Sequence, residues 1–148
     1  MIHIIVDTRE KLLLWEENIR VTKKKLIVGD YTTQRLISKF IIERKSGEDL
    51  YGSIIHNHAR FSREMLRAKV NKIELCVYVE CTYHDFWNLR FNSGNRRKMK
   101  PKTLKRIIDT VIQRRGIEFI WCKHRDRMRN RILGRLRKEE NKLLNKKK

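Results

Sequence analysis

The sequence is poor in the residues that break up or cross-link a chain: one proline, six glycines and three cysteines occur among 148 residues. It has neither an internal repeat nor a low-complexity linker, which predicts a single domain large enough to fold without disulfides. The cysteines, Cys76, Cys81 and Cys122, are odd in number, and two lie in apolar runs. This pattern favours reduced thiols and excludes a disulfide framework.

Long apolar segments are also absent. No run approaches the roughly 18 to 20 residues that a membrane-spanning helix needs. Residues 1–7 have no basic stretch ahead of their apolar residues, as a secretory signal would. We therefore expect an intracellular protein, in the cytoplasm, nucleoid or nucleus, that neither crosses a membrane nor is secreted.

Acidic residues are scarce relative to basic ones. The 17 Asp and Glu face 37 Lys and Arg, which gives a formal net charge of +20. Such an excess calls for an anionic partner, and nucleic acid is the leading candidate because Lys and Arg bind phosphates and release condensed counterions. A membrane surface is the weaker alternative. The pattern shows no need for a small-molecule cofactor.

Hydrophobic periodicity predicts strands that alternate with helices, and hence an α/β domain. The strand-length apolar runs are Ile2–Val6, Leu26–Val28, Phe40–Ile42, Ile73–Val79 and Ile117–Trp121. The helical patterns cover 11–19, 48–70 (as one or two helices), 102–114 and 126–144. We expect residues 1–140 to form the domain and the basic residues 141–148 to be a frayed tail.

Apolar residues form a stripe along each of the last two predicted helices, which marks the face turned toward the core. In 102–114 the stripe consists of Leu104, Ile107, Ile108, Val111 and Ile112. In 126–144 it consists of Met128, Ile132, Leu133 and Leu136.

The chemistry is concentrated in two neighbouring segments, 28–31 and 40–49. Asp30 follows an apolar run, Glu43 and Lys45 close the next one, and Asp49 comes four residues after Lys45. Side chains in a strand alternate between its faces, so Glu43 and Lys45 point the same way and Arg44 points the opposite way. Glu43 and Lys45 can therefore share one site.

A hairpin formed by 30–35 and 39–45, with its turn near Leu36 and Ile37, would place Asp30 opposite Glu43 or Arg44. No Asn-Gly turn fixes the register, so both pairings stay open. Two carboxylates brought together repel, and they take up a proton or a cation. An all-oxygen pair favours Mg²⁺ or Mn²⁺, which could hold a phosphate and activate a water.

Lys45 would then orient or deprotonate the attacking water, or stabilise the phosphorane oxygens. Arg44 would hold structure or a backbone phosphate. Together with the basic composition, these residues indicate hydrolysis of a phosphodiester bond.

Three motifs in this order resemble the XPF/Hef-type nuclease domain, a branch of the restriction-endonuclease-like superfamily. They are Val6-Asp7-Thr8-Arg9-Glu10, Val28-Gly29-Asp30-Tyr31, and Ile42-Glu43-Arg44-Lys45 followed by Asp49. Weaker similarity continues through Arg60-Phe61, 77–80 and 116–120. In the helix after Arg60-Phe61 the family often has glutamine where this chain has Glu64, and Cys81 stands where it has glycine.

The resemblance implies a restriction-endonuclease-like central mixed β-sheet flanked by α-helices. It implies Asp7, Asp30 and Glu43 as metal-site carboxylates, Lys45 as catalytic, Arg44 and Asp49 as further members of the site, and Glu10 in support. It further implies cleavage of branched, forked or flapped DNA in repair or recombination, and a homodimer. The family commonly continues into a tandem helix-hairpin-helix domain, and we expect a stand-alone nuclease domain here.

Other interpretations apply to individual residues. Asp7 could cap a helix, and Asp49 could be a first-turn helix acid. Cys81, His84, Cys122 and His124 could hold zinc if two strand ends meet, although packed thiols and surface histidines are the commoner outcome. A basic segment is expected to contact DNA, and its residues are Arg90, Arg96, Arg97, Lys98, Lys100 and Lys102.

Two other functions compete with a structure-selective endonuclease. One is a non-catalytic DNA-binding or scaffold domain, in which the acids only pair with nearby bases. The other is a sequence-specific restriction-type nuclease on the same fold.

Overall fold

The computed structural model describes residues 2–10, 19–88 and 101–148, which form a mixed six-stranded sheet in the order β2-β1-β3-β4-β5-β6. The strands are β1 (His3–Val6), β2 (Arg20–Lys23), β3 (Tyr31–Thr33), β4 (Phe40–Ser46), β5 (Glu74–Glu80) and β6 (Glu118–Cys122). Strand β3 is antiparallel to both β1 and β4, whereas β4, β5 and β6 run parallel. The predicted mixed α/β sheet is confirmed.

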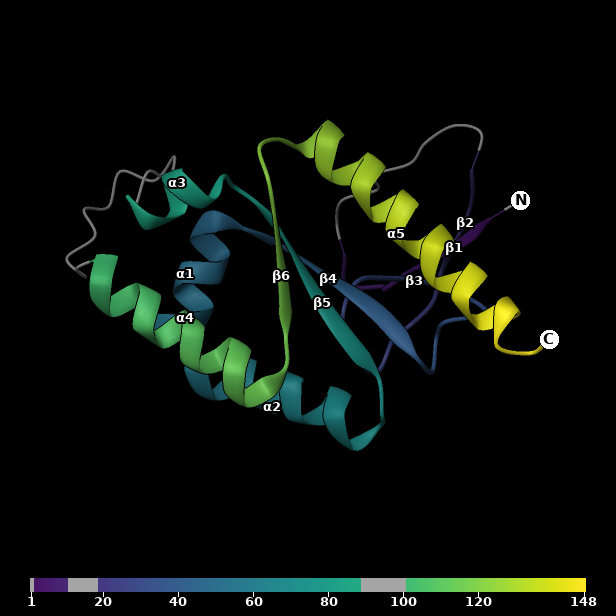
Figure 1. Ribbon diagram of the computed structural model, residues 1–148, viewed down its shortest axis with the longest axis horizontal. Helices are drawn as coiled ribbons and strands as arrows, with labels where there is room; N and C mark the ends of the chain where they lie inside the picture. The colour runs from purple at the N-terminus through teal and green to yellow at the C-terminus, as the bar shows by residue number, and fades with distance from the viewer. Residues whose placement is uncertain (1, 11–18, 89–100) are drawn as a thin grey trace.

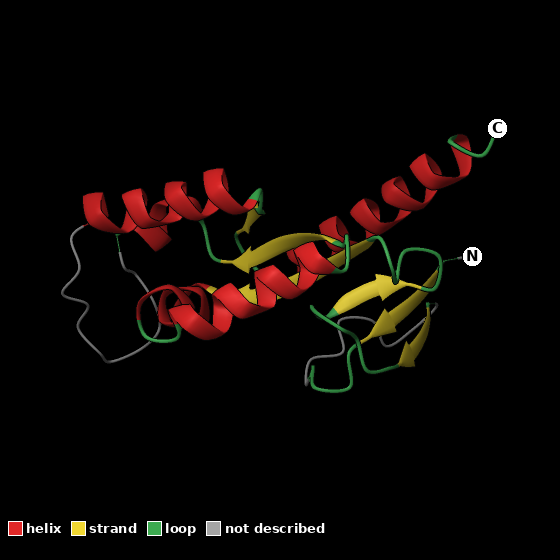
Figure 2. Cartoon of the chain, turned by 90° about the horizontal axis from the view of Figure 1, so that it is seen from below, coloured by secondary structure: helices red, strands yellow, loops and turns green. Residues whose placement is uncertain are grey.

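Helices cover both faces of this sheet (Figure 1). They are α1 (Gly47–Ile55), α2 (His58–Val70), the short α3 (Tyr83–Trp87), α4 (Pro101–Arg115) and α5 (Arg125–Asn145). Figure 2 shows α5 as a long rod that runs past the sheet toward the C-terminus. Because α5 ends only at Asn145, the helix extends into the segment predicted as a frayed tail. Within the described residues, no helix has the length and apolar character needed to cross a membrane.

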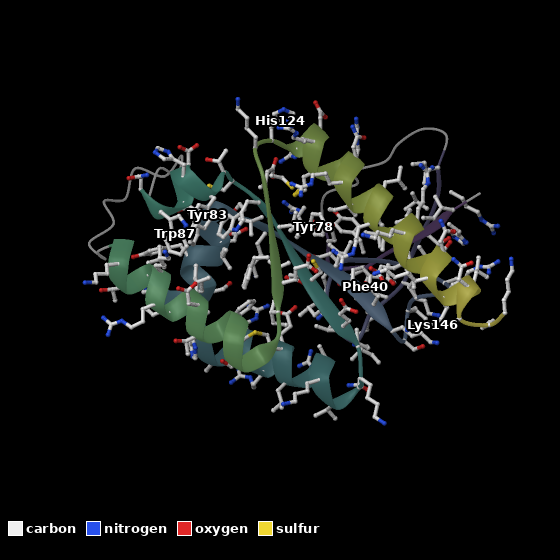
Figure 3. The ribbon with its side chains drawn as sticks, viewed as in Figure 1. Phe40, Tyr78, Tyr83, Trp87, His124 and Lys146 are labelled. Carbon is white, nitrogen blue, oxygen red and sulfur yellow. The ribbon has the colours of Figure 1, made fainter. Side chains whose placement is uncertain are left out.

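Each face of the sheet has its own apolar core, because successive strand residues alternate between the faces. Ile41 and Val77 pack with buried residues of α1, α2 and α4, among them Leu104 and Ile108. Ile42 and Tyr78 pack on the other face with the α5 residues Met128, Ile132 and Leu136, as the predicted stripe required. Figure 3 shows Phe40 and Tyr78 beside α5, and the α3 residues Tyr83 and Trp87 on the side of α3 toward α4.

Local predictions from the sequence were partly wrong. Leu26–Val28 is not a strand, although Leu26 and Val28 are buried. It forms bends because the backbone N–H of Leu26 donates to the Asp7 carboxylate rather than to a neighbouring strand, and Gly29 then turns the chain at φ +75°. Strand β2 and helix α3 were not predicted. The helix expected over 11–19 falls almost entirely outside the described residues.

Candidate active site

The β3–β4 hairpin sets the position of the first carboxylate. Tyr31 pairs with Ile42, and the backbone N–H of Asp30 donates to the Ile42 carbonyl at 2.8 Å. Continuing this register places Asp30 opposite Glu43, which was one of the two pairings left open by the sequence. The Asp30 Oδ2 atom also accepts the backbone N–H of Arg44 at 2.7 Å. The hairpin therefore fixes both the backbone and the carboxylate of Asp30.

Gly29 makes this placement possible. Its positive φ is one that L side chains rarely adopt, and a Cβ at this position would clash with the Ile41 side chain and approach the Ile42 carbonyl oxygen at 3.2 Å. The chain before Asp30 can therefore lie directly against β4 only with glycine at position 29. This explains in physical terms why the motif reads Gly-Asp.

Glu43 and Lys45 project to the same side of β4, as strand alternation predicted. The Lys45 Nζ atom lies 3.6 Å from Glu43 Oε1 and 5.4 Å from the centre of the Phe61 ring. Glu43 is 9% exposed. An ammonium held between a carboxylate and an aromatic face is restricted to one small region of the site.

Asp30 and Glu43 are both held in an environment that opposes their charge. Burial, together with the nearby Glu10 and Glu64 carboxylates, raises the pKa of Asp30 to about 7, although the Arg44 N–H acts in the opposite direction. Burial likewise raises the pKa of Glu43, and Asp30 and Glu64 raise it further, while Lys45 lowers it. Such perturbed carboxylates are typical of functional sites.

Glu64 is a member of this site that the sequence reasoning missed. It comes from α2, and its carboxylate lies within hydrogen-bonding range of Glu43. The only signal was its position, three residues after Phe61, where the family often has glutamine. A polar residue about one turn after the buried Phe61 could have been assigned to the site side of the helix.

Asp7 lies at the edge of the site with its oxygens already engaged. Its carboxylate accepts the Leu26 N–H at 2.7 Å and the Arg9 Nε–H at 2.8 Å, and it is 1% exposed. Burial alone would raise its pKa, but the hydrogen bonds from Arg9 and Leu26 hold it below the usual value. Through its hydrogen bond with the Leu26 N–H, Asp7 connects segment 24–28 to the end of β1.

Arg44 points away from Glu43 and Lys45 and forms an ion-pair network. Its guanidinium binds Glu10 at 3.1 and 3.2 Å and lies 3.7 Å from Glu80, which in turn pairs with Arg125 of α5 at 3.3 Å. Arg44 therefore joins the first motif to β4, β5 and α5. The predicted supporting position of Glu10 is consistent with this contact.

Asp49 is an exposed residue in the first turn of α1. The hydroxyl of Ser46 accepts the Asp49 backbone N–H at 3.0 Å and caps the helix. This matches the interpretation of Asp49 as a first-turn helix acid, although the residue also faces the cleft described next.

A cleft of about 980 Å³ brings these residues together between the β3–β4 hairpin, α1 and α2. Its lining includes seven carboxylates, namely Asp7, Glu10, Asp30, Glu43, Glu48, Asp49 and Glu64. It also includes the cations Arg9, Arg44, Lys45, Arg60, Arg63 and Arg67. All seven acidic and basic residues predicted for the chemical site line this one cleft.

The two remaining predictions have different outcomes. Arg90, Arg96, Arg97, Lys98 and Lys100 lie outside the described residues, and Lys102 is exposed on the first turn of α4. The zinc hypothesis fails for the described chain: Cys81 and Cys122 are adjacent in an isolated bridge, but they pack into opposite cores, and both are free buried thiols. Strand alternation separates their sulfur atoms across the sheet.

Among the described residues, no group of three or more His, Cys, Asp or Glu side chains is arranged to hold a metal ion. The implied set of Asp7, Asp30 and Glu43 is thus not assembled as one cluster, because Arg9 and Leu26 occupy Asp7. Mg²⁺, however, commonly takes one or two protein carboxylates and completes its shell with water and phosphate. The donor atoms of Asp30 and Glu43 fit that chemistry.

The ERCC4 domain model matches residues 6–130 of the sequence. This chain belongs to the ERCC4 domain family. Its structure is similar to that of XPF from Aeropyrum pernix, with a TM-score of 0.71 and 19% identity over 98% of this chain and 68% of that one. It is also similar to XPF from Aeropyrum pernix in complex with DNA, with a TM-score of 0.68 and 16% identity over 95% of this chain and 66% of that one. Among curated proteins, no match to this sequence is found.

The family places a nuclease-type domain over the segment that holds the whole cleft. At these identities the two solved structures establish the fold, and they agree with the resemblance noted from the motifs.

Proposed function

We propose that this ERCC4-family protein is a DNA endonuclease that hydrolyses phosphodiester bonds with Mg²⁺ or Mn²⁺ held by Asp30 and Glu43. The observation that carries this proposal is the pair of neighbouring carboxylates of Asp30 and Glu43, both with raised pKa, beside the Lys45 ammonium in an open cleft. A divalent cation bound there would offset their repulsion, polarise the phosphate and make a water more acidic.

The protein's own groups would divide the remaining work. Lys45 can donate hydrogen bonds to a non-bridging phosphate oxygen or to the attacking water, because its Nζ atom is held 3.6 Å from Glu43. Glu43 can accept a hydrogen bond from that water and orient it for in-line attack. Arg44 supports the site indirectly, since its backbone N–H orients Asp30 while its side chain is anchored by Glu10.

We further propose branched, forked or flapped DNA as the substrate and a homodimer as the assembly. Support for DNA comes from the net charge of +20 and from the similarity to an XPF solved in complex with DNA. Support for branch selectivity and for the dimer comes from the motif resemblance alone.

The test is a cleavage panel. Labelled fork, flap and linear duplex are incubated with purified protein and Mg²⁺, Mn²⁺ or EDTA, with circular plasmid as a fourth substrate. We expect metal-dependent nicking that is faster on the fork and flap than on the duplex. Discrete plasmid fragments would indicate a sequence-specific nuclease instead. Salt-sensitive binding without cleavage in either metal would contradict the proposal and leave a DNA-binding domain.

A further inference from the structure

Helix α2 presents three arginines along one side, next to the carboxylates. Arg60, Arg63 and Arg67 are exposed, and all three line the cleft. At about 100° per residue, the three positions fall within about 60° of one another around the helix. Glu64 projects about 40° from Arg60 in the same projection, toward the cleft floor. One helix therefore supplies both an acid to the site and a row of cations at its rim.

These three guanidinium groups are not neutralised by protein carboxylates. Within the described part of the chain, none of them forms an ion pair within 4 Å, and Arg67 donates only to the Ile27 carbonyl, at 3.3 Å. The other two arginines of the cleft differ, because Arg9 pairs with Asp7 and Arg44 pairs with Glu10. The guanidinium groups of Arg60, Arg63 and Arg67 therefore keep N–H donors that an external anion can use.

The row is long enough to contact more than one phosphate of a DNA strand. A helix rises 1.5 Å per residue, so Arg60 to Arg67 spans about 10.5 Å along α2, and each strand of duplex DNA carries one phosphate for about every 3.4 Å of helix axis. Without its cations the cleft, whose lining includes seven carboxylates, would repel phosphate. The arginines of α2 allow a DNA backbone to approach these carboxylates.

We infer that Arg60, Arg63 and Arg67 form the surface that holds the sugar-phosphate backbone of one DNA strand as it enters the carboxylate site. This inference rests on the proposed function for the identity of the ligand. It assigns the contact to residues of α2, which were not among the DNA-binding residues predicted from the sequence. Contacts of this kind position a strand without reading its sequence.

The first experiment measures binding without cleavage. The variant Arg60→Gln/Arg63→Gln/Arg67→Gln is made in a Glu43→Gln background, and its affinity for a labelled fork is measured from 50 to 200 mM salt. Losing three phosphate contacts should make the negative slope of log affinity against log salt shallower by about 2.7. The loss of affinity between 50 and 200 mM salt should then be about 40-fold smaller than for the parent. Because the three side chains are exposed, the melting temperature should not change.

The matched control removes the same charge elsewhere. Lys69, Lys105 and Lys138 are exposed and do not line the cleft. Their triple substitution by glutamine should lower the slope by less than one. An unchanged slope in the arginine variant, or an equal loss in both variants, would overturn the inference.

A second experiment locates the contact on the DNA. Neutral methylphosphonates are scanned singly along each strand, and interfering positions should cluster within about three consecutive steps of one strand for the parent and disappear in the arginine variant. Interference that persists in the variant contradicts the inference. Neither assay needs cleavage, so a protein that never cuts DNA but shows this loss refutes the nuclease proposal and leaves the surface supported.

Discussion

The two faces of the sheet treat their carboxylates in opposite ways. On the α5 face, Arg135 binds Glu118 and Glu139 at 2.9 Å each. Its hydrogen bond lowers the pKa of Glu118, and hydrogen bonds from Lys142 and Arg135 lower that of Glu139 in spite of burial. On the cleft face, burial and neighbouring acids raise the pKa of both Asp30 and Glu43.

The carboxylates of the α5 face stabilise the fold when they are charged, whereas those of Asp30 and Glu43 destabilise it when they are charged. In the α5 network, Glu118 and Glu139 each have a cationic partner within 3 Å. In the cleft, Arg44 lowers the pKa of Asp30 and Lys45 lowers that of Glu43, but burial and the neighbouring carboxylates outweigh both cations. Such an arrangement costs stability unless a proton or a cation binds, which is why perturbed acids of this kind indicate function.

The largest expected effect is on cleavage. Asp30→Asn or Glu43→Gln should reduce the rate of DNA cleavage in Mg²⁺ by more than about 100-fold, beyond the 10 to 100-fold typical of residues that only support metal ligands. Each substitution keeps the size of the side chain but removes an anionic oxygen that the cation would use. Rates are measured on the best substrate of the cleavage panel, with protein in excess.

The matched control for these substitutions is Glu118→Gln, which removes one carboxylate from the α5 network. Its cleavage rate should stay within about threefold of the parent, because surface changes away from the site seldom matter. If the Glu118 and Glu43 variants lose activity equally, the functional distinction between the two faces is wrong.

The same comparison explains what the sequence could and could not predict. Strands β1, β4, β5 and β6, the two long helices and the common face of Glu43 and Lys45 follow from periodicity, which is a local property. Asp30 was correctly placed near Glu43 because a hairpin turn is also local. The absence of a turn signal left the register open, and only the Asp30 N–H to Ile42 bond resolves it.

Features that depend on long-range contacts could not be predicted from the sequence. Leu26–Val28 has strand-like residues, but the Asp7 carboxylate, 19 positions earlier, takes the Leu26 N–H. Asp7 itself was implied as a metal ligand, and nothing in its motif shows that Arg9 and Leu26 occupy its oxygens. Glu64 enters the site only through the packing of α2 on α1 and β5. The partners of a carboxylate, and hence its role, are set by tertiary structure.

Binding of Mg²⁺ should stabilise the folded protein, and more so at pH 8 than at pH 5.5. In Mg²⁺ at about 100 times its dissociation constant, the melting temperature at pH 8 should rise by about 5 to 10 °C, from a binding term of about 2.7 kcal/mol. At pH 5.5 the shift should be much smaller, because Asp30, with a pKa of about 7, holds a proton that competes with the cation. Differential scanning fluorimetry measures both.

The Asp30→Asn/Glu43→Gln double variant serves as the control and should show almost no Mg²⁺-dependent shift at either pH. An equal shift in the parent at pH 5.5 and pH 8 would place the cation elsewhere on the protein.

The smallest effect, and the most direct test of the comparison, is on stability without metal. At pH 8 in EDTA, Glu139→Gln should lower the free energy of unfolding by about 1 to 3 kcal/mol, since it weakens two charged hydrogen bonds. Glu43→Gln should raise it by about 1 kcal/mol, because it removes a charge that burial opposes. Urea unfolding measures both variants against the parent.

The signs of these two effects follow from linkage between protonation and folding. The pKa of Glu139 is lowered on folding, so its stabilising effect is present above its unfolded pKa and is lost as pH falls through the folded one. The pKa of Glu43 is raised, so its charge destabilises the fold as pH rises above its unfolded pKa. The difference in unfolding free energy between each variant and the parent should therefore shrink toward pH 4. If both variants are destabilised at pH 8, Glu43 is a matched structural acid like Glu139, and the contrast between the two faces fails.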